Sequence, residues 1–183
     1  MPKFGKSSSS RLSQLDSRMQ EIFNKAIETS LYDFGIVQGK RTYEDQFKLW
    51  KKGRKWNPDL GEESDPEAWV ISGKGGVVTK TMKSKHLSGR AVDVAYWNPE
   101  KGGYDWEDLE KYKEIGTHIK SVADELGYGD VFEWGGDWTK WKDFPHYQIA
   151  KMEDKIMDEM KVLDNPIEEK AGKDLVSAEN YGK

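Results

Sequence analysis

The distribution of aromatic side chains most constrains the fold of this 183-residue chain. The chain contains 8 Trp, 8 Tyr and 6 Phe, and all of them except Tyr181 precede residue 151. An enclosed aromatic side chain buries about 150–250 Å², so these residues can supply a packed core although 34% of the chain is charged. We therefore expect one folded unit that ends near residue 150, and we exclude a wholly disordered chain.

The charge balance and the lack of cysteine exclude several classes of protein. With 29 Lys and Arg against 33 Asp and Glu, the net charge of −4 argues against a general nucleic-acid binder, which needs clustered cations. Without cysteine there is no disulfide, no thiolate metal site and no cysteine nucleophile. Any metal must therefore bind to carboxylates and to the three histidines, which are His86, His118 and His146.

Two observations concern membranes and targeting. The sequence has no run of 18 apolar residues, so we expect no transmembrane helix and no stable membrane insertion. Its first residues, MPKFGKSSSSRLSQ, include lysines but no apolar stretch, so we expect no secretory signal. We therefore expect synthesis in the cytoplasm.

Three segments have the spacing of amphipathic helices. Apolar residues recur at every third or fourth position over about residues 10–30 and 106–126. A third helix is expected over Tyr43–Gly53. Its candidate buried residues are Phe47, Leu49 and Trp50.

Four short segments are expected to form strands. The clearest is AVDVAYW, in which alternation places Asp93 on one face between the small residues Ala91 and Ala95. The space beside Asp93 suits a functional site better than a packed core. The other three are expected around residues 35–38, over 132–138, where a Gly-Gly turn breaks the strand, and over 146–150. Helices in the first third followed by these strands predict an α+β fold.

Composition divides the chain into three regions. Residues 1–10 are basic and rich in serine, which predicts a flexible arm, and residues 11–150 form the expected domain. Within that domain, residues 54–80 are rich in Gly, Pro and acidic residues and make an unusually long connection. Residues 151–183 are expected to form a short helix and an acidic tail.

Two polar segments, SKHLSGRAVD and DFPH, carry the candidate chemistry. They offer the imidazoles of His86 and His146 and the carboxylate of Asp93 as metal ligands, and Asp143 as a second carboxylate. Catalytic zinc sites typically have three nitrogen or oxygen ligands, a fourth position for water and a nearby base. A lone His-x6-Asp spacing also recurs by chance, so a metal site and a purely structural pair are both open at this point.

The motifs taken together resemble the LAS zinc peptidases. SKHLSGRAVD is similar to their S-x-H-x-x-G-x-A-x-D motif, DFPH to their Glu/Asp-x-x-His motif, and GKRTYEDQ carries an arginine at the place of their upstream arginine. The segment FEWGGDW followed by DFPHYQ is most similar to the phage L-alanyl-D-glutamate endopeptidases of that group. The resemblance spans about residues 35–150.

This resemblance implies a fold, a cofactor and residue roles. The fold would be that of LAS/Hedgehog-like peptidases, a small antiparallel sheet flanked by helices with a zinc site at the sheet, and residues 11–150 would be the zinc peptidase domain. Zn²⁺ would be bound by His86, Asp93 and His146, Asp143 would be the general base, Arg41 would stabilise the oxyanion, and Ser84 would bind substrate.

The implied function is that of a phage endolysin. Such a monomeric enzyme would hydrolyse the L-Ala–D-Glu bond of peptidoglycan stem peptides, and would wait in the host cytoplasm until a holin opens the membrane. One alternative is a D,D-carboxypeptidase or D-Ala-D-Ala dipeptidase of the same family. Another is a non-catalytic, zinc-stabilised virion or wall-binding protein.

Other polar residues have simpler interpretations. His118 lies beside the apolar stripe of its helix and is expected at the surface or at its boundary. Glu133 and Asp137 are alternative bases, but the Gly-Gly between them predicts a turn. Gln46 is expected to support the segment of Arg41. A group of cations either attracts stem-peptide carboxylates or forms a solvated loop, and its members are Lys80, Lys83, Lys85 and Arg90.

Overall fold

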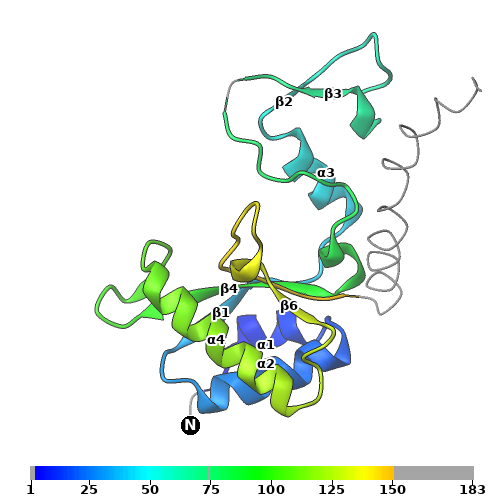
Figure 1. The fold of residues 1–183 in the computed structure, drawn as a ribbon. Coiled ribbons are helices and arrows are strands. Elements are labelled where there is room, and N and C mark those ends of the chain that lie inside the picture. Colours follow the sequence, from blue (N-terminus) through cyan, green and yellow to red (C-terminus); the bar gives the residue numbers. More distant parts are fainter. Residues whose placement is uncertain (1–2, 74, 151–183) are drawn as a thin grey trace, which may run out of the picture. The chain divides into compact units, whose positions relative to one another are not determined.

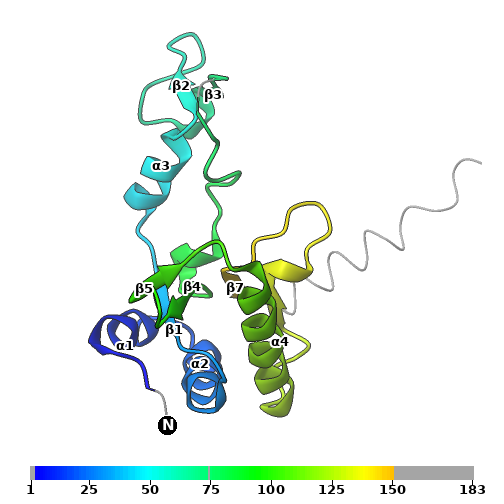
Figure 2. The ribbon, with the colours of Figure 1, turned by 90° about the vertical axis from the view of Figure 1, so that its left-hand side faces the viewer.

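The computed structural model describes residues 3–73 and 75–150 (Figures 1 and 2). One compact unit comprises Met1–Ile149. The short helix and acidic tail predicted for residues 151–183 lie outside the described residues. None of the described helices has the length and apolarity needed to cross a membrane.

A five-stranded antiparallel sheet forms the centre of this unit. Its order is β1-β4-β7-β6, and β5 pairs with the end of β4. The strands are β1 (Phe34–Gln38), β4 (Ala91–Asn98), β5 (Gly103–Asp105), β6 (Phe132–Trp134) and β7 (His146–Ile149). The four predicted strands are present, but the one predicted over residues 132–138 ends at Trp134, where the 3-10 turn η3 (Gly135–Asp137) begins. The α+β class with a small antiparallel sheet is confirmed.

Three helices cover one face of this sheet (Figures 1 and 2). They are α1 (Lys6–Leu12), α2 (Ser17–Thr29) and α4 (Leu109–Glu125). The core contains Val92, Val94 and Tyr96 from β4 together with the apolar stripes of the helices. Because side chains alternate along a strand, Asp93 projects from the other face. The predicted alternation along AVDVAYW is thus confirmed.

The N-terminal segment corrects two predictions. The helix α1 begins at Lys6, inside the expected flexible arm, and Ser8 is buried because its Oγ accepts a hydrogen bond from the N–H of Ile36 (3.0 Å). The helix expected over about 10–30 is interrupted after Leu12, and Asp16 caps the second helix by accepting from the N–H of Arg18. Apolar spacing missed both features because α1 is built from serines and cations, and buried leucines continue the spacing across the break.

The region that follows β1 is more structured than expected. The predicted third helix is confirmed as α3 (Tyr43–Lys51). Its backbone becomes extended at Lys52, and Gly53 follows with a left-handed φ of +75°. The long connection after it contains a second sheet of β2 (Arg54–Trp56) and β3 (Trp69–Ile71). The predicted buried positions of α3 are wrong, because Phe47, Leu49 and Trp50 are only half-buried. The buried residue of this helix is Gln46.

The helix predicted over 106–126 begins later than expected. β5 precedes it, and Asp108 caps it by accepting a hydrogen bond from the N–H of Lys111 (3.2 Å). His118 is half-buried, and its Nε2 lies 3.0 Å from the carbonyl oxygen of Ala26 in α2. It is therefore a boundary histidine that joins two helices, as its place beside the apolar stripe predicted.

Candidate metal centre

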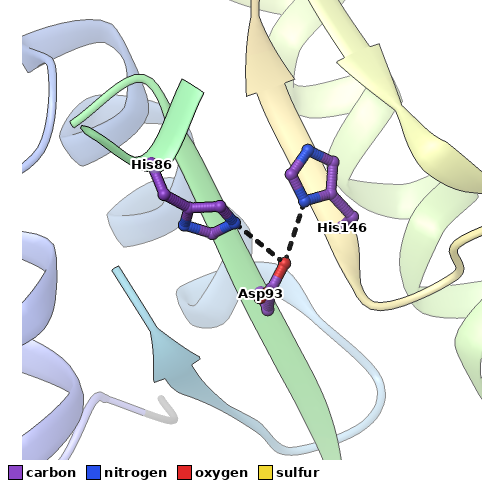
Figure 3. Close-up of side chains that lie close together, drawn as sticks. All are labelled: His86, Asp93 and His146. Carbon is purple, nitrogen blue, oxygen red and sulfur yellow. Dashed lines mark hydrogen bonds and ion pairs between the residues drawn. The ribbon is translucent and has the colours of Figure 1, made fainter. Parts of the chain in front are cut away.

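Three side chains converge on the face of the sheet that is opposite the core (Figure 3). Asp93 comes from β4, His146 from β7, and His86 from the 3-10 turn η2 (Lys85–Ser88). Oδ1 of Asp93 lies 2.9 Å from Nδ1 of His146 and 3.4 Å from Nε2 of His86. One ligand atom from each residue lies within 4.8 Å of the others, so the group can hold a metal ion.

The pairing of strands brings two of these residues together. Asp93 and His146 are register partners in the antiparallel pair β4–β7. Directly opposed residues in such a pair have Cβ atoms about 4.5–5.5 Å apart and project from the same face. The contact between the carboxylate and the imidazole therefore follows from the sheet itself.

His86 is positioned by its own turn and by a distant segment. Oγ of Ser84 caps η2 by accepting the N–H of His86 (3.3 Å), and Gly89 ends the turn with a left-handed φ of +69°. Nδ1 of His86 lies 2.8 Å from the carbonyl oxygen of Gly39. The N–H of Arg41 in turn donates to the carbonyl of His86 (3.1 Å). Both the ring and the backbone of His86 are thus held by residues 39–41.

The carboxylate and one imidazole stabilise each other's charge. Burial raises the pKa of Asp93, but hydrogen bonds with His146 and His86 outweigh this effect and hold that pKa well below its usual range. Burial lowers the pKa of His146, but the hydrogen bond and charge of Asp93 raise it overall. The two groups therefore favour a carboxylate beside an imidazolium, and a metal that binds to Nδ1 must displace a proton.

Asp143 lies in the turn that leads into β7. Its carbonyl accepts the N–H of His146 (3.1 Å), and its own N–H donates to the carbonyl of Gly135 (3.0 Å). A Cβ atom on Gly135 would collide with the carbonyl oxygen of Asp143, so only glycine allows this approach. Burial raises the pKa of Asp143, and the charge of Asp93 raises it further against the opposing effect of the two histidines. The half-buried carboxyl is therefore electrostatically coupled to the three-residue group.

Arg41 is held by Gln46, as predicted. Its Nη1 donates to Oε1 of Gln46 (2.6 Å), and Nε2 of the buried Gln46 donates to the carbonyl of Thr81 (2.7 Å) and to Oγ1 of Thr79 (3.1 Å). Burial lowers the pKa of Arg41, while the charge of Asp93 raises it. The guanidinium of Arg41 therefore interacts electrostatically with the carboxylate of Asp93.

The two alternative bases have other partners. Oε2 of Glu133 accepts a hydrogen bond from Nε2 of Gln148 (2.6 Å), and Asp137 forms an ion pair with Lys120 of α4. Both carboxylates are therefore already engaged, which favours Asp143 as the base.

Aromatic side chains line the neighbourhood of the centre. The ring of Trp138 lies 5.3 Å from the ring of His146. Nζ of Lys80 lies 4.0 Å from the ring centroid of Trp141, so one of the cations predicted around the first motif contacts the loop that precedes Asp143.

Two contacts to the histidines were missed by the sequence analysis. The carbonyl of Gly39 leaves no side-chain signal. Oε1 of Gln148 lies 3.2 Å from Nε2 of His146. The sequence did contain a signal for the contact between Gln148 and His146, because residues two apart on a predicted strand project from the same face.

Comparisons with known proteins agree with this geometry. The sequence model of the family described as "Phage L-alanyl-D-glutamate peptidase" matches residues 1–61 and 69–162. The L-alanyl-D-glutamate peptidase of Escherichia phage T5 is 31% identical over 150 residues, which cover 81% of this chain and 90% of that protein. The peptidoglycan L-alanyl-D-glutamate endopeptidase CwlK of Bacillus subtilis (strain 168) is 31% identical over 124 residues, which cover 64% and 60%. The crystal structure of the Serratia marcescens L-Ala D-Glu endopeptidase ChiX superposes with a TM-score of 0.60 and 26% identity, covering 84% of this chain and 92% of that one.

Proposed function

Because the chain belongs to the phage L-alanyl-D-glutamate peptidase family, we propose that it is a zinc-dependent hydrolase that cleaves the L-Ala–D-Glu bond of peptidoglycan stem peptides. The observation that carries this proposal is the convergence of His86, Asp93 and His146 at the sheet, with Asp143 beside them. These are the residues that the sequence motifs single out.

The three ligand atoms fit a zinc ion. Two nitrogens and one oxygen are a typical ligand set of catalytic zinc, which keeps its fourth position for water. Two atoms each about 2.1 Å from one tetrahedral ion are about 3.4 Å apart, and Oδ1 of Asp93 lies 2.9 Å and 3.4 Å from the two imidazole nitrogens. A bound zinc ion supplies a Lewis acid that lowers the pKa of water and polarises a carbonyl.

Asp143 serves as the base. Its raised pKa makes the carboxylate a better proton acceptor than a solvent-exposed aspartate, at the cost of ionising at higher pH. It takes a proton from the attacking water and then gives a proton to the nitrogen of D-Glu as the peptide bond breaks.

Arg41 and Ser84 act on the substrate. The guanidinium of Arg41, oriented by Gln46, faces the scissile carbonyl and stabilises the negative charge that develops on its oxygen. The hydroxyl of Ser84 accepts the N–H of His86 and keeps its own proton, with which it donates to the substrate.

Two phage relatives support a biological setting for the proposed activity. The named relatives include a peptidase of Escherichia phage T5 and one of Listeria phage A118. We therefore place this activity in phage-induced lysis: synthesis in the host cytoplasm and action on the wall after holin-type release.

Digestion of purified peptidoglycan tests the proposal. The protein is incubated with the wall material in zinc, with a chelator, and with a chelator followed by excess zinc, and the products are identified by mass spectrometry. We expect fragments with a new D-Glu N-terminus, their loss with the chelator and their return with zinc. Release of free D-Ala would instead indicate a carboxypeptidase, and tight zinc binding without any cleavage would indicate a binding protein.

A further inference from the structure

The imidazole of His146 has a partner at each nitrogen. Nδ1 points to Asp93, and Nε2 lies 3.2 Å from Oε1 of Gln148. Nε2 of Gln148 donates in turn to Oε2 of Glu133 (2.6 Å). A line of side chains therefore runs from the metal centre across β7 to β6.

The sheet places these side chains in register. His146 and Gln148 are two residues apart on β7 and so project from the same face. Glu133 of β6 is the direct register partner of Gln148. All three side chains consequently meet on the face that carries the centre.

Which of these groups can donate and which can only accept fixes the direction of each hydrogen bond in the line. A carboxylate only accepts hydrogen bonds, so Gln148 must turn its NH₂ group to Glu133 and its carbonyl oxygen to His146. That carbonyl oxygen also only accepts, so Nε2 of His146 must carry a proton. With Nε2 held protonated by Gln148, Nδ1, the nitrogen that faces Asp93, is the one that gives up its proton and offers a lone pair when a metal binds.

We infer that Gln148 and Glu133 are positioning residues that select Nδ1 of His146 as the atom that binds the metal. This inference rests on the proposed function, because it requires a metal at the centre. Histidine ligands of metals commonly donate their other N–H to a carbonyl or carboxylate, and such partners tune metal affinity.

His86 is held in the same way, but the roles of its two ring nitrogens are exchanged. Its Nδ1 lies 2.8 Å from the backbone carbonyl of Gly39, which leaves Nε2 for the centre. A backbone carbonyl cannot exchange its acceptor for a donor, whereas a glutamine amide can turn over and present its NH₂ group. Glu133 prevents that rotation, because it holds the NH₂ group of Gln148. Glu133 thus fixes the orientation of the amide, and Gln148 fixes which nitrogen of His146 carries the proton.

Zinc affinity of the full chain tests the inference. The dissociation constant is measured by competition with a chromophoric chelator for the wild type, Gln148→Met and Glu133→Gln. We expect Gln148→Met to raise the constant about 10- to 100-fold, the range typical for such outer partners. Glu133→Gln keeps the size of the side chain but pairs with either end of the amide, so we expect a smaller rise in the same direction.

Gln20→Met is the matched control. Gln20 is a half-buried glutamine of α2 that donates to the carbonyl of Leu15, away from the centre. We expect its zinc constant to stay within about twofold of the wild type, as for a surface change away from special features. Thermal unfolding of each metal-free variant identifies any loss caused by misfolding.

A second measurement reports the tautomer directly. Long-range ¹H–¹⁵N spectra of the zinc-loaded wild type should show His146 protonated at Nε2, and those of Glu133→Gln a mixture of forms. Protonation at Nδ1, or wild-type zinc affinity in Gln148→Met, would overturn the inference while leaving the proposed function intact. Failure of the wild type to bind zinc at all would overturn both.

Discussion

Asp93 and His146 face each other as register partners on the antiparallel strands β4 and β7, with 2.9 Å between Oδ1 and Nδ1. A slip of one residue in this pairing would turn one of them toward the core, because side chains alternate between the faces. Val92 and Tyr147, which pair next to them, are buried in that core and resist such a slip. The geometry of the centre is therefore secured by hydrophobic packing on the opposite face.

Zinc should stabilise the folded protein. A ligand that binds only the native state adds about 2.7 kcal/mol to the free energy of unfolding at one hundred times its dissociation constant. We expect this increment in the wild type and in His118→Ala, and its near-complete loss in His86→Ala. Urea unfolding with and without zinc measures it. An equal increment in His86→Ala would show that the ion binds elsewhere.

Asp143→Asn should remove the base and leave the centre in place. General-base catalysis contributes about 10²- to 10⁴-fold, so kcat should fall within this range while zinc affinity changes little. Asp137→Asn is the control, because Asp137 pairs with Lys120 and should be dispensable for turnover. The two variants are compared by the rate at which D-Glu N-termini appear. Comparable losses in both would contradict the assignment.

Gly135→Ala should displace Asp143 although it replaces none of the three proposed metal ligands. The added methyl group would overlap the carbonyl oxygen of Asp143, so the turn must shift. A displacement of about 1 Å at a catalytic group can cost about 100-fold in rate. Gly103→Ala is the control, because a Cβ atom there meets nothing within 4 Å. Steady-state kinetics on the same substrate decide the matter, and full activity of Gly135→Ala would refute the argument.

Asp105 should contribute to stability above about pH 4 and lose that contribution on acidification. Hydrogen bonds from Lys101 and Asn98 and from the N–H of Glu107 lower its pKa to about 2. The unfolded carboxyl has a pKa of about 3.9, so the unfolded state binds more protons between these values. Stability should therefore fall as the pH drops from about 4 to 2. Asp105→Asn should show a shallower fall in urea unfolding of the metal-free protein. Equal slopes in the two proteins would contradict the prediction.

The sequence singles out the residues that meet at the candidate centre better than it predicts the details of the fold. The group of His86, Asp93 and His146 and the support of Arg41 by Gln46 follow from local motifs, and apolar spacing places α4 and the strands. The burial of Gln46 could not be foreseen, because it depends on hydrogen bonds to residues 79 and 81, more than 30 positions away. The burial of Ser8 likewise depends on the edge of β1. In each case a polar group becomes buried because a distant segment satisfies it, and periodicity does not detect such partners.

The line from His146 to Glu133 illustrates the same limit within the site. Strand alternation alone relates His146 to Gln148, but only the pairing of β6 with β7 brings in Glu133, fifteen positions away. From the sequence alone, Glu133 is an alternative base next to a predicted Gly-Gly turn. Because Glu133 accepts a hydrogen bond from Gln148, its register partner on β7, we interpret it as a positioning residue and not as a base.

Residues 39–41 contact both sides of His86, since Gly39 receives its ring and Arg41 holds its backbone. The same three residues thus include the arginine that is proposed to face the substrate, and they hold His86, a proposed metal ligand. Substitutions in residues 39–41 should therefore weaken both metal binding and stabilisation of the transition state. We expect added metal not to restore the catalytic rate of variants in residues 39–41. Added metal should restore the rate of variants of Gln148 or Glu133, which affect metal binding alone.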